Sequence, residues 1–278
     1  MLRADFVEVV GRALSEDLGA LGDITSDACV PQTSQSEARF VARAPGVIAG
    51  LDVVAYVFEA LDPSVTFEPR VSDGDRVEVG AEVARIAGHS RSILTGERTA
   101  LNLLGRMSGV ATATAELVEA VSGTGARISD TRKTVPGLRA LDKYAVRVGG
   151  GMNHRFGLYD AALIKDNHLV AVGSITQAVA AVRERVNPGV MIEVEVESLE
   201  QLSEALETDA DRVLLDNMGP ELLRQAVALA GDRITTEASG GVTLENVRQL
   251  AETGVDIISV GWITHSAPQL DIALDFVS

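Results

Sequence analysis

Three lysines, Lys133, Lys143 and Lys165, are all that this chain of 278 residues contains, and they lie close together in the sequence. The same stretch holds two of the four histidines and several arginines, namely His154, His168, Arg132, Arg139, Arg147 and Arg155. The formal net charge of the whole chain is −16. Cations gathered in an otherwise acidic protein indicate a binding site for a small polyanion. The alternative interpretation is a solvated face of a helix.

Short aliphatic runs that alternate with helical segments must position these side chains. The runs are 126–129, 161–164, 190–196, 212–215, 233–236 and 256–260. Strands separated by helices of this kind are typical of βα units and a parallel sheet. We therefore predict an α/β protein with an incomplete parallel α/β barrel. A doubly wound sheet is the competing fold, but no G-x-G-x-x-G motif follows an early strand.

A smaller α+β region precedes this alternation. The pattern predicts helices over 5–18 and 52–61, strands over 38–43, 65–71 and 82–86, and then two helices over 92–107 and 109–121. We predict an N-terminal α+β open-sandwich domain over 1–108 and a barrel catalytic domain over 109–265, with 266–278 packing back on the first domain. The turn Asp73-Gly74-Asp75-Arg76-Val77 resembles that of a biotinyl or lipoyl carrier but lacks the lysine that would hold the cofactor, so we interpret it as a structural β-turn.

Polar residues follow most of the predicted barrel strands, and in α/β barrels the chemistry lies at these carboxyl ends. Lys165 follows a buried-looking apolar run, where a lysine is costly unless it is used or paired. Glu193, Glu195 and Glu197 alternate along one strand and so share one face. Glu195 and Asp216 are residue types that bind a divalent metal or ribose hydroxyls.

Two glycine-rich segments admit two interpretations each. Ser239-Gly240-Gly241 precedes a helix predicted from Thr243, so its amides form either a phosphate cradle or a plain β-to-α turn. Gly149-Gly150-Gly151 either lets a ligand approach the backbone or is a flexible link.

The composition also limits partners and location. A strongly negative chain is repelled by nucleic acid and by anionic membrane, so neither is expected as a partner. The sequence has no run of about 18 apolar residues, and its first twenty residues are unlike a secretory leader. Cys29 is the only cysteine, which suits a reducing compartment. We expect a cytoplasmic protein.

The motifs taken together point to one family. They are Glu16-Asp17-Leu18-Gly19, Gly22-Asp23-Ile24-Thr25, Glu97-Arg98-Thr99-Ala100-Leu101-Asn102, Asp130-Thr131-Arg132-Lys133-Thr134, Gly149-Gly150-Gly151, Asn153-His154-Arg155, Lys165-Asp166-Asn167-His168, Glu193-Val194-Glu195-Val196, Leu215-Asp216-Asn217 and Ser239-Gly240-Gly241. In this order the chain resembles, over nearly its whole length, the quinolinate phosphoribosyltransferases, also called nicotinate-nucleotide pyrophosphorylases (carboxylating).

This resemblance implies a fold, an assembly and a reaction. The fold is an N-terminal open α/β sandwich joined to an incomplete barrel, and the assembly is a homodimer in which Arg98 enters the partner's site. The reaction, in de novo NAD biosynthesis, takes quinolinate and phosphoribosyl pyrophosphate to nicotinate mononucleotide, pyrophosphate and CO2, using Mg2+. The implied catalytic residues are Lys133, Lys165, Glu195 and Asp216, the last two also binding the metal.

The resemblance also implies which side chains meet each part of the substrates. Planar guanidinium groups suit a dicarboxylate, so quinolinate is assigned to Arg98, Arg132, Arg155, His154 and Lys165. Lys133 is assigned to the pyrophosphate, and Glu195 and Asp216 to the positive charge that develops at the anomeric carbon. The 5-phosphate is assigned to Ser239, Gly240 and Gly241, and Gly261 is added to the substrate-binding set.

Three alternatives stay open at this point. A Schiff-base lyase would use Lys165 covalently, and a non-catalytic sensor of phosphate ligands would keep the anion pocket without turnover. A pyrophosphorylase-like paralogue linked to molybdenum transport shares part of the pattern.

Overall fold

The structure is a computed structural model that describes residues 2–277. It divides into two compact units. The first comprises the chain up to Ala115, Thr134–Gly150 and the chain from Ile263 onward; the second comprises Glu116–Lys133 and Gly151–Trp262. The predicted domain boundary at residue 108 stays a prediction. Among the described residues, no helix combines the length and apolar character needed to cross a membrane.

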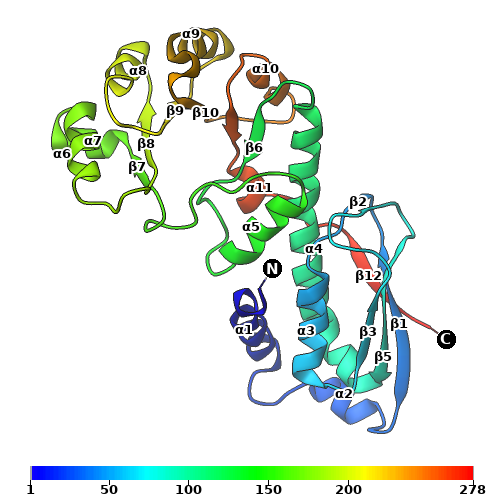
Figure 1. Ribbon diagram of the computed structural model, residues 1–278. Coiled ribbons are helices and arrows are strands. Elements are labelled where there is room, and N and C mark those ends of the chain that lie inside the picture. Colours follow the sequence, from blue (N-terminus) through cyan, green and yellow to red (C-terminus); the bar gives the residue numbers. More distant parts are fainter. Residues whose placement is uncertain (1, 278) are drawn as a thin grey trace. The chain divides into compact units, whose positions relative to one another are not determined.

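A four-stranded antiparallel sheet, in the order β12-β1-β5-β3, forms the frame of the first unit (Figure 1). Its strands are β1 (Gln35–Ala42), β3 (Thr66–Pro69), β5 (Glu82–His89) and β12 (Ile272–Phe276), and β2 (Gly46–Val47) pairs separately with β4 (Arg76–Val77). The helices are η1 (Arg3–Asp5), α1 (Val7–Leu18), α2 (Ile24–Cys29), α3 (Leu51–Leu61), the first part of α4 (Ser90–Ala120) and α5 (Arg139–Val148). The predicted α+β architecture of this region is confirmed.

Alternation along β1 builds the core of this unit. Ala38, Phe40 and Ala42 are completely buried, whereas Arg39 between them is exposed, as expected for a sheet with one covered face. Phe40 lies edge-on to Phe58 of α3, with ring centroids 6.2 Å apart. Figure 1 shows α3 and α4 on this face of the sheet.

The turn at Asp73 is structural, as predicted. Asp75 N–H donates to the Ser72 carbonyl oxygen, and Gly74 takes the φ of +99° that favours glycine at this point. The Asp73 carboxylate accepts hydrogen bonds from the backbone amides of Gly50 and Leu51 at the start of α3, at 2.9 and 3.1 Å. It therefore caps that helix, a role that the sequence analysis did not identify.

The long helix α4 corrects one prediction. Two helices separated near residue 108 were expected, but α4 runs without interruption from Ser90 to Ala120. A Cβ on Gly109 would lie 2.0 Å from the carbonyl oxygen of Pro268, so this glycine permits a close approach of two backbones and does not end the helix. Gly149 acts in the same way, because its Cβ would lie 2.4 Å from the Ala111 carbonyl oxygen. The packing requirement favours a structural explanation for Gly149 over a ligand-binding one.

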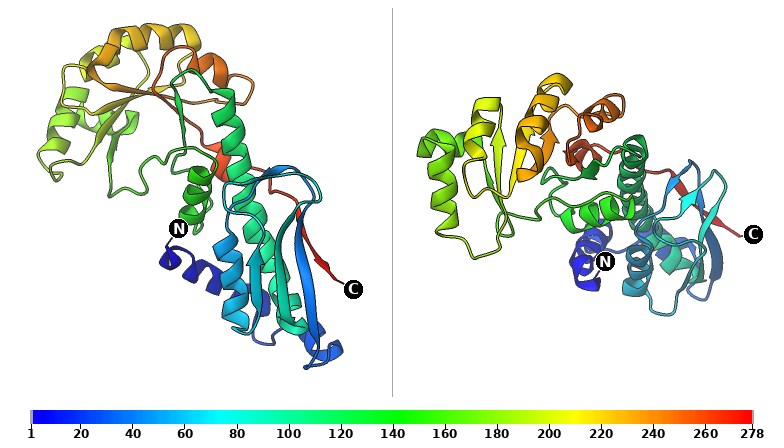
Figure 2. Two further views of the ribbon diagram at one scale, coloured as in Figure 1. Left: turned by 45° about the vertical axis from the view of Figure 1, so that its right-hand side comes forward. Right: turned by 45° about the horizontal axis from the view of Figure 1, so that its top comes forward.

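The second unit contains a six-stranded parallel sheet in the order β6-β11-β10-β9-β8-β7 (Figures 1 and 2). The strands are β6 (Arg127–Ser129), β7 (Ala162–Ile164), β8 (Ile192–Val196), β9 (Arg212–Asp216), β10 (Thr235–Ser239) and β11 (Ile257–Ser259). The helices are α6 (Asp166–Val172), α7 (Ile175–Arg183), α8 (Leu199–Ala205), α9 (Pro220–Ala230), η2 (Gly231–Arg233), α10 (Val247–Ala251) and α11 (Trp262–His265), the last lying across the division between the units.

This strand order confirms an incomplete barrel. Strands β7 to β10 each pair with the next strand in the chain, without the reversal of order that defines a doubly wound sheet. The edge strands β6 and β7 do not pair with each other, so the barrel is open.

The two faces of the barrel strands differ in chemistry. One set of alternate residues is apolar and buried, for example Val194 and Val196 of β8 and Val213 and Leu215 of β9. The other set is largely polar and includes Glu193, Glu195, Arg212, Asp216, Glu237 and Ser239. Because strand side chains alternate with a period of two, this second set shares the interior face of the barrel.

Candidate active site

A cavity of about 590 Å³ lies at the carboxyl ends of the barrel strands in the second unit. All but two of the predicted site residues line it: Arg132, Lys133, His154, Arg155, Lys165, Glu195, Asp216, Ser239, Gly240 and Gly241. The exceptions are Arg98, an exposed residue on the part of α4 that belongs to the first unit, and Gly261, which follows β11 and does not line the cavity. Parallel strands bring their carboxyl ends to one edge, which explains why residues so distant in sequence meet.

Lys165 is the last residue before α6 and projects from the end of β7. Its Nζ donates to Oε2 of Glu195, at the end of β8, over 2.5 Å. The side chain of Lys165 is 44% exposed and that of Glu195 is 11% exposed, so the cation is open to the cavity while its partner is mostly enclosed. This pair joins the cationic and acidic sides of the cavity.

Asp216 ends β9 and faces the loop after β10. Its Oδ2 accepts a hydrogen bond from the Asn217 side-chain amide over 2.6 Å. Asn217 has a φ of +54°, the left-handed conformation that asparagine tolerates better than most residues. A Cβ on Gly240 would lie 2.1 Å from Asn217 Oδ1, so only glycine allows this loop to pass so closely.

The loop at Ser239-Gly240-Gly241 differs from the prediction. The helix expected to start near Thr243 is present as α10 but begins four residues later, at Val247. Thr243 N–H donates instead to Asn246 Oδ1 at 2.8 Å, which makes a turn. Gly240 and Gly241 both have positive φ, at +99° and +60°. Any anion bound here would meet loop amides and not the end of a helix.

Asp130 belongs to the motif Asp130-Thr131-Arg132-Lys133-Thr134 but was not predicted as a site residue. It follows β6 and is completely buried. Its Oδ1 accepts from the backbone N–H of His154 over 2.8 Å, and its Oδ2 accepts from the side chain of Asn153 over 2.6 Å. Asp130 therefore fixes the segment that carries His154 and Arg155.

Largely buried charged residues gather around His154 at the wall of the cavity, and two of them, Arg212 and Glu237, were not predicted as site residues. His154 Nε2 lies 2.8 Å from Glu193 Oε2 and 3.4 Å from Glu237 Oε1. Arg212 Nη1 donates to Glu237 Oε2 over 3.0 Å, and the Ser259 hydroxyl donates to Glu237 Oε1. Burial, followed by the charge of Glu193, raises the pKa of Glu237 to about 7. One sequence signal could have identified Glu237. It lies two residues from both Thr235 and Ser239, so in a strand all three side chains share one face.

These residues are also the one set of three possible metal donors, His154, Glu193 and Glu237, found within the described part of the chain. Arg212 already neutralises one of the two carboxylates at hydrogen-bond distance. The predicted metal pair, Glu195 and Asp216, is a different pair at the cavity itself.

The basic stretch in the sequence is divided between the two units. Arg139, Lys143 and Arg147 lie on α5, which belongs to the first unit, and none of them lines the cavity. Lys143 is only 1% exposed. Only part of the basic stretch in the sequence therefore forms the cavity. The rest consists of charged residues on helix α5.

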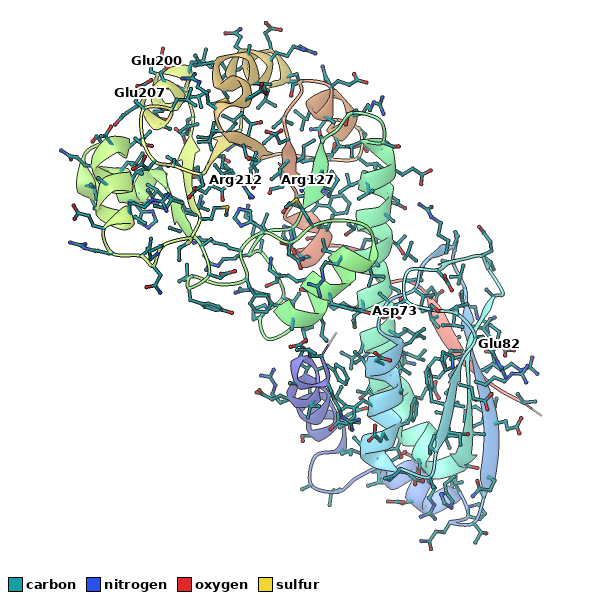
Figure 3. The ribbon with its side chains drawn as sticks, in the orientation of Figure 1. Asp73, Glu82, Arg127, Glu200, Glu207 and Arg212 are labelled. Carbon is teal, nitrogen blue, oxygen red and sulfur yellow. The ribbon has the colours of Figure 1, made fainter. Side chains whose placement is uncertain are left out.

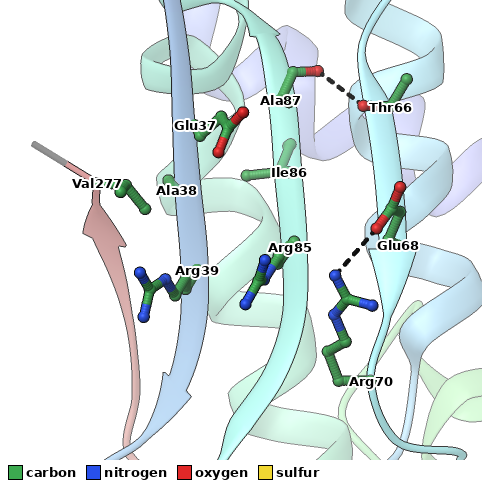
Figure 4. Close-up of a pocket in the computed structure, with 10 residues that line it drawn as sticks. All are labelled: Glu37, Ala38, Arg39, Thr66, Glu68, Arg70, Arg85, Ile86, Ala87 and Val277. Carbon is green, nitrogen blue, oxygen red and sulfur yellow. Dashed lines mark hydrogen bonds and ion pairs between the residues drawn. The ribbon is translucent and has the colours of Figure 1, made fainter.

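A second hollow lies on the exposed face of the four-stranded sheet (Figure 4) and contains three arginines. Each of them has a carboxylate partner: Arg85 lies 2.5 Å and Arg39 lies 3.8 Å from Glu82, and Arg70 lies 3.1 Å from Glu68. Arg39 and Arg85 share Glu82, and Glu37 supplies a third carboxylate on this surface, so three arginines meet three carboxylates. Exposed pairs of this kind contribute little to stability, and the hollow has no net charge to attract an anion.

Comparison with known proteins agrees with this geometry. Two family models match, described as quinolinate phosphoribosyl transferase, N-terminal domain, over residues 23–108, and the C-terminal domain of the same enzyme, over residues 110–275. The chain is 49% identical over 273 residues to the nicotinate-nucleotide pyrophosphorylase [carboxylating] of Mycobacterium leprae, covering 96% of each chain. It is 42% identical over 288 residues to a quinolinate phosphoribosyltransferase [decarboxylating] of Nicotiana glauca, covering 97% of this chain and 82% of that one.

The fold comparison leads to the same group of proteins. The crystal structure of NadC from Streptococcus pyogenes superposes with a TM-score of 0.95 at 40% identity, covering 100% of this chain and 99% of that one. The nicotinate-nucleotide pyrophosphorylase of Ehrlichia chaffeensis gives the same TM-score at 37% identity, covering 99% of this chain and 100% of that one.

Proposed function

The chain belongs to the quinolinate phosphoribosyltransferase family, and from that premise we infer that it is a decarboxylating pentosyltransferase of NAD biosynthesis. It transfers the phosphoribosyl group of phosphoribosyl pyrophosphate to quinolinate and releases pyrophosphate and CO2, with nicotinate mononucleotide as the other product. The observation that carries this conclusion is the cavity at the barrel strand ends, which brings arginine and lysine side chains together with the carboxylates of Glu195 and Asp216 and with the Ser239-Gly240-Gly241 loop.

The cationic side of the cavity suits quinolinate. Arg132, Arg155 and Lys165 present positive charge to a ligand with two carboxylates. Each charge-assisted hydrogen bond contributes on the order of 1.5–3 kcal/mol, so a substrate with one carboxylate binds more weakly than one with two. His154 completes this side of the proposed site.

The remaining residues suit the phosphoribosyl donor. Lys133 is exposed at the cavity and is proposed to neutralise the departing pyrophosphate. Glu195 and Asp216 are proposed to stabilise the positive charge at the anomeric carbon through the ribose hydroxyls. The amides of the Ser239-Gly240-Gly241 loop are proposed to hold the 5-phosphate.

The reaction needs no nucleophile from the protein. The quinolinate ring nitrogen forms the new bond to the anomeric carbon as the bond to pyrophosphate breaks. The resulting pyridinium accepts the electron pair released when the adjacent carboxylate leaves as CO2, and a proton takes its place on the ring. The protein therefore acts by orientation and by electrostatic stabilisation.

The direct test is incubation of the protein with quinolinate, phosphoribosyl pyrophosphate and Mg2+. We expect nicotinate mononucleotide and pyrophosphate in equal amounts, measured by chromatography. Folded protein that binds both compounds without forming product would favour a non-catalytic sensor and contradict the proposed function.

Magnesium is proposed as the cofactor. Glu195 and Asp216 offer carboxylate oxygens at the cavity, and Mg2+ is commonly held by one or two carboxylates together with substrate phosphates. These residues therefore fit the ion, which when bound neutralises charge on the pyrophosphate. Removing divalent ions with EDTA is expected to lower the initial rate about tenfold or more, and excess Mg2+ is expected to restore it. An unchanged rate in EDTA would contradict a role for the metal.

A homodimer is proposed for the complete enzyme, with Arg98 of one subunit serving the site of the other. In support, Arg98 is an exposed arginine that belongs to the first unit, and within the described residues no side-chain hydrogen bond or ion pair holds it. The open edge of the barrel at β7 also borders an apolar hollow of about 440 Å³, and Leu158 beside it is 73% exposed. Uncovered apolar surface of this kind is typical of an interface.

The cytoplasm is the proposed location. Cys29 is an exposed free thiol, which is a chemical state that a reducing compartment preserves.

A further inference from the structure

Buried polar residues at the wall of the cavity, among them Glu237, Ser259 and His154, form a continuous chain of contacts that links three barrel strands to Arg155. The chain begins at Arg212 of β9 and Ser259 of β11, which both donate to Glu237 of β10. It continues from Glu237 to His154 and ends at Arg155, whose guanidinium lines the cavity. Every member lies in the second unit.

Glu237 is held on both of its oxygens. Arg212 Nη1 lies 3.0 Å from Oε2, and the Ser259 hydroxyl donates to Oε1. Glu237 is completely buried and the Arg212 side chain is only 14% exposed. In a site so poorly screened by water, a paired carboxylate holds its geometry firmly, and removing one partner leaves a buried charge uncompensated.

The imidazole ring of His154 connects Glu237 to Arg155. Its Nε2 faces Glu193 at 2.8 Å and Glu237 at 3.4 Å, while its Nδ1 accepts the backbone N–H of Arg155 over 2.8 Å. An accepting Nδ1 carries no proton, so the ring proton is on Nε2 and points to the two carboxylates. The ring orientation is therefore tied to Glu237 on one side and to the Arg155 main chain on the other.

Arg155 is in turn fixed at its far end. Its Nη1 donates to the carbonyl oxygen of Ala161 over 3.1 Å, and the side chain lines the cavity. A guanidinium group recognises a carboxylate best when its plane is already oriented, because less conformational entropy is lost on binding.

We propose that Glu237, locked by Arg212 and Ser259, is a positioning residue for dicarboxylate recognition that acts through His154 to orient Arg155. This inference rests on the proposed function and deepens it, because it separates recognition of quinolinate from recognition of the phosphoribosyl donor. A metal ion at His154, Glu193 and Glu237 is the competing explanation. Arg212 argues against it, since a cation already lies against Glu237 at 3.0 Å.

The test is Glu237→Gln, which keeps the size of the side chain and removes its charge when kinetics are measured above about pH 8, where the wild-type carboxyl group is mostly ionised. We expect the KM for quinolinate to rise about tenfold or more, and the KM for phosphoribosyl pyrophosphate to change by less than about twofold. Glu207→Gln is the matched control, since it removes the same charge from an exposed position beyond α8, on the outside of the barrel (Figure 3). The control is expected to match the wild type in both constants.

Ser259→Ala provides a second, milder variant in case Glu237→Gln fails to fold. It removes one donor to Glu237 and leaves every charge in place, so a smaller rise in the same constant is expected. Wild-type protein that forms no product would contradict the proposed function itself, whereas an active wild type with unchanged quinolinate KM in the variants would contradict only this inference.

Two further results would overturn the inference. An equal rise in both KM values together with a lower thermal unfolding midpoint would indicate a merely structural role for Glu237. Elemental analysis that found one divalent ion per wild-type chain, absent from Glu237→Gln, would identify the buried residues as a metal site.

Discussion

Replacing Lys165 by alanine is expected to lower kcat/KM for quinolinate by roughly 100-fold to 1000-fold while leaving the protein folded. The variant removes a cation that is open to the cavity, and it leaves Glu195 without its partner at 2.5 Å. A lost charge-assisted contact combined with an uncompensated carboxylate near an anionic substrate accounts for a loss of this size. The measurement is steady-state kinetics with quinolinate varied, alongside thermal unfolding.

Stability should be affected much less than activity. The Lys165 side chain is 44% exposed, so water screens much of its interaction with Glu195. We expect the free energy of unfolding to fall by less than about 2 kcal/mol. A cooperative unfolding transition close to that of the wild type would separate a catalytic defect from misfolding.

Arg224→Ala is the control for this prediction. Arg224 also pairs with a carboxylate in the second unit, since its Nη1 lies 3.4 Å from Glu221 Oε2. Both side chains are largely exposed, and neither lines the cavity. Its removal is expected to leave kcat/KM within about twofold of the wild type, because exposed pairs contribute little. Wild-type kinetics in Lys165→Ala would contradict its assigned role.

Lys165→Arg separates the electrostatic role from covalent catalysis. Arginine keeps the positive charge but has no primary amine that can form a Schiff base at ordinary pH. A Schiff-base lyase would lose all activity in this variant, and its wild-type form would be trapped by borohydride with a carbonyl substrate. The proposed role predicts that Lys165→Arg retains clearly more activity than Lys165→Ala.

The barrel and most of the site could be predicted from the sequence because both depend on local patterns. Aliphatic runs set the strands, and the residue after each run lies at the carboxyl edge by the geometry of parallel strands. Lys165 and Asp216 were found in this way, and the cavity brings them together. The family resemblance added Arg98, for which the local pattern gave only an exposed helical arginine.

The rest depended on contacts between distant segments. The sequence pattern predicts a break between two helices near residue 108, whereas Gly109 continues α4 and lets the carbonyl oxygen of Pro268 approach the helix closely. Asp73 caps α3 and accepts the Tyr144 hydroxyl at 2.7 Å, a pairing across 71 residues that no periodicity encodes. Such long-range packing overrides local propensity, which explains why α4 is one helix and not two.

Glu237 was overlooked for a different reason. The predicted strand over 233–236 ended too early, which placed Glu237 in a loop, whereas β10 extends from Thr235 to Ser239. A glutamate inside a buried strand violates the usual apolar pattern, and such violations occur where a side chain has a specific partner. Element boundaries are the least certain part of a sequence-based assignment, and here the boundary concealed a buried charge.

The proposed sharing of Arg98 between subunits predicts the largest effect of all, the recovery of activity from two inactive chains. Arg98→Ala and Lys165→Ala are each expected to be nearly inactive alone. When the two chains are co-expressed with different tags and the doubly tagged dimer is purified, one of its two sites has an intact Arg98 and an intact Lys165. That heterodimer should regain about half of the wild-type rate per dimer, as the symmetry of a twofold assembly requires.

The reciprocal pairing makes this experiment decisive. A chain with both substitutions, paired with a wild-type chain, should be inactive if Arg98 acts across the interface, because the site of the wild-type chain then faces a partner that lacks the arginine. If Arg98 acts within its own chain, the result reverses: this second dimer keeps about half of the wild-type rate, and the first pairing stays inactive.

A monomer in solution would yield no doubly tagged species and would contradict the proposed assembly. Both dimers contain the same substitutions in total, so differences in folding or expression cannot produce the reversal, and the comparison isolates the subunit from which Arg98 acts.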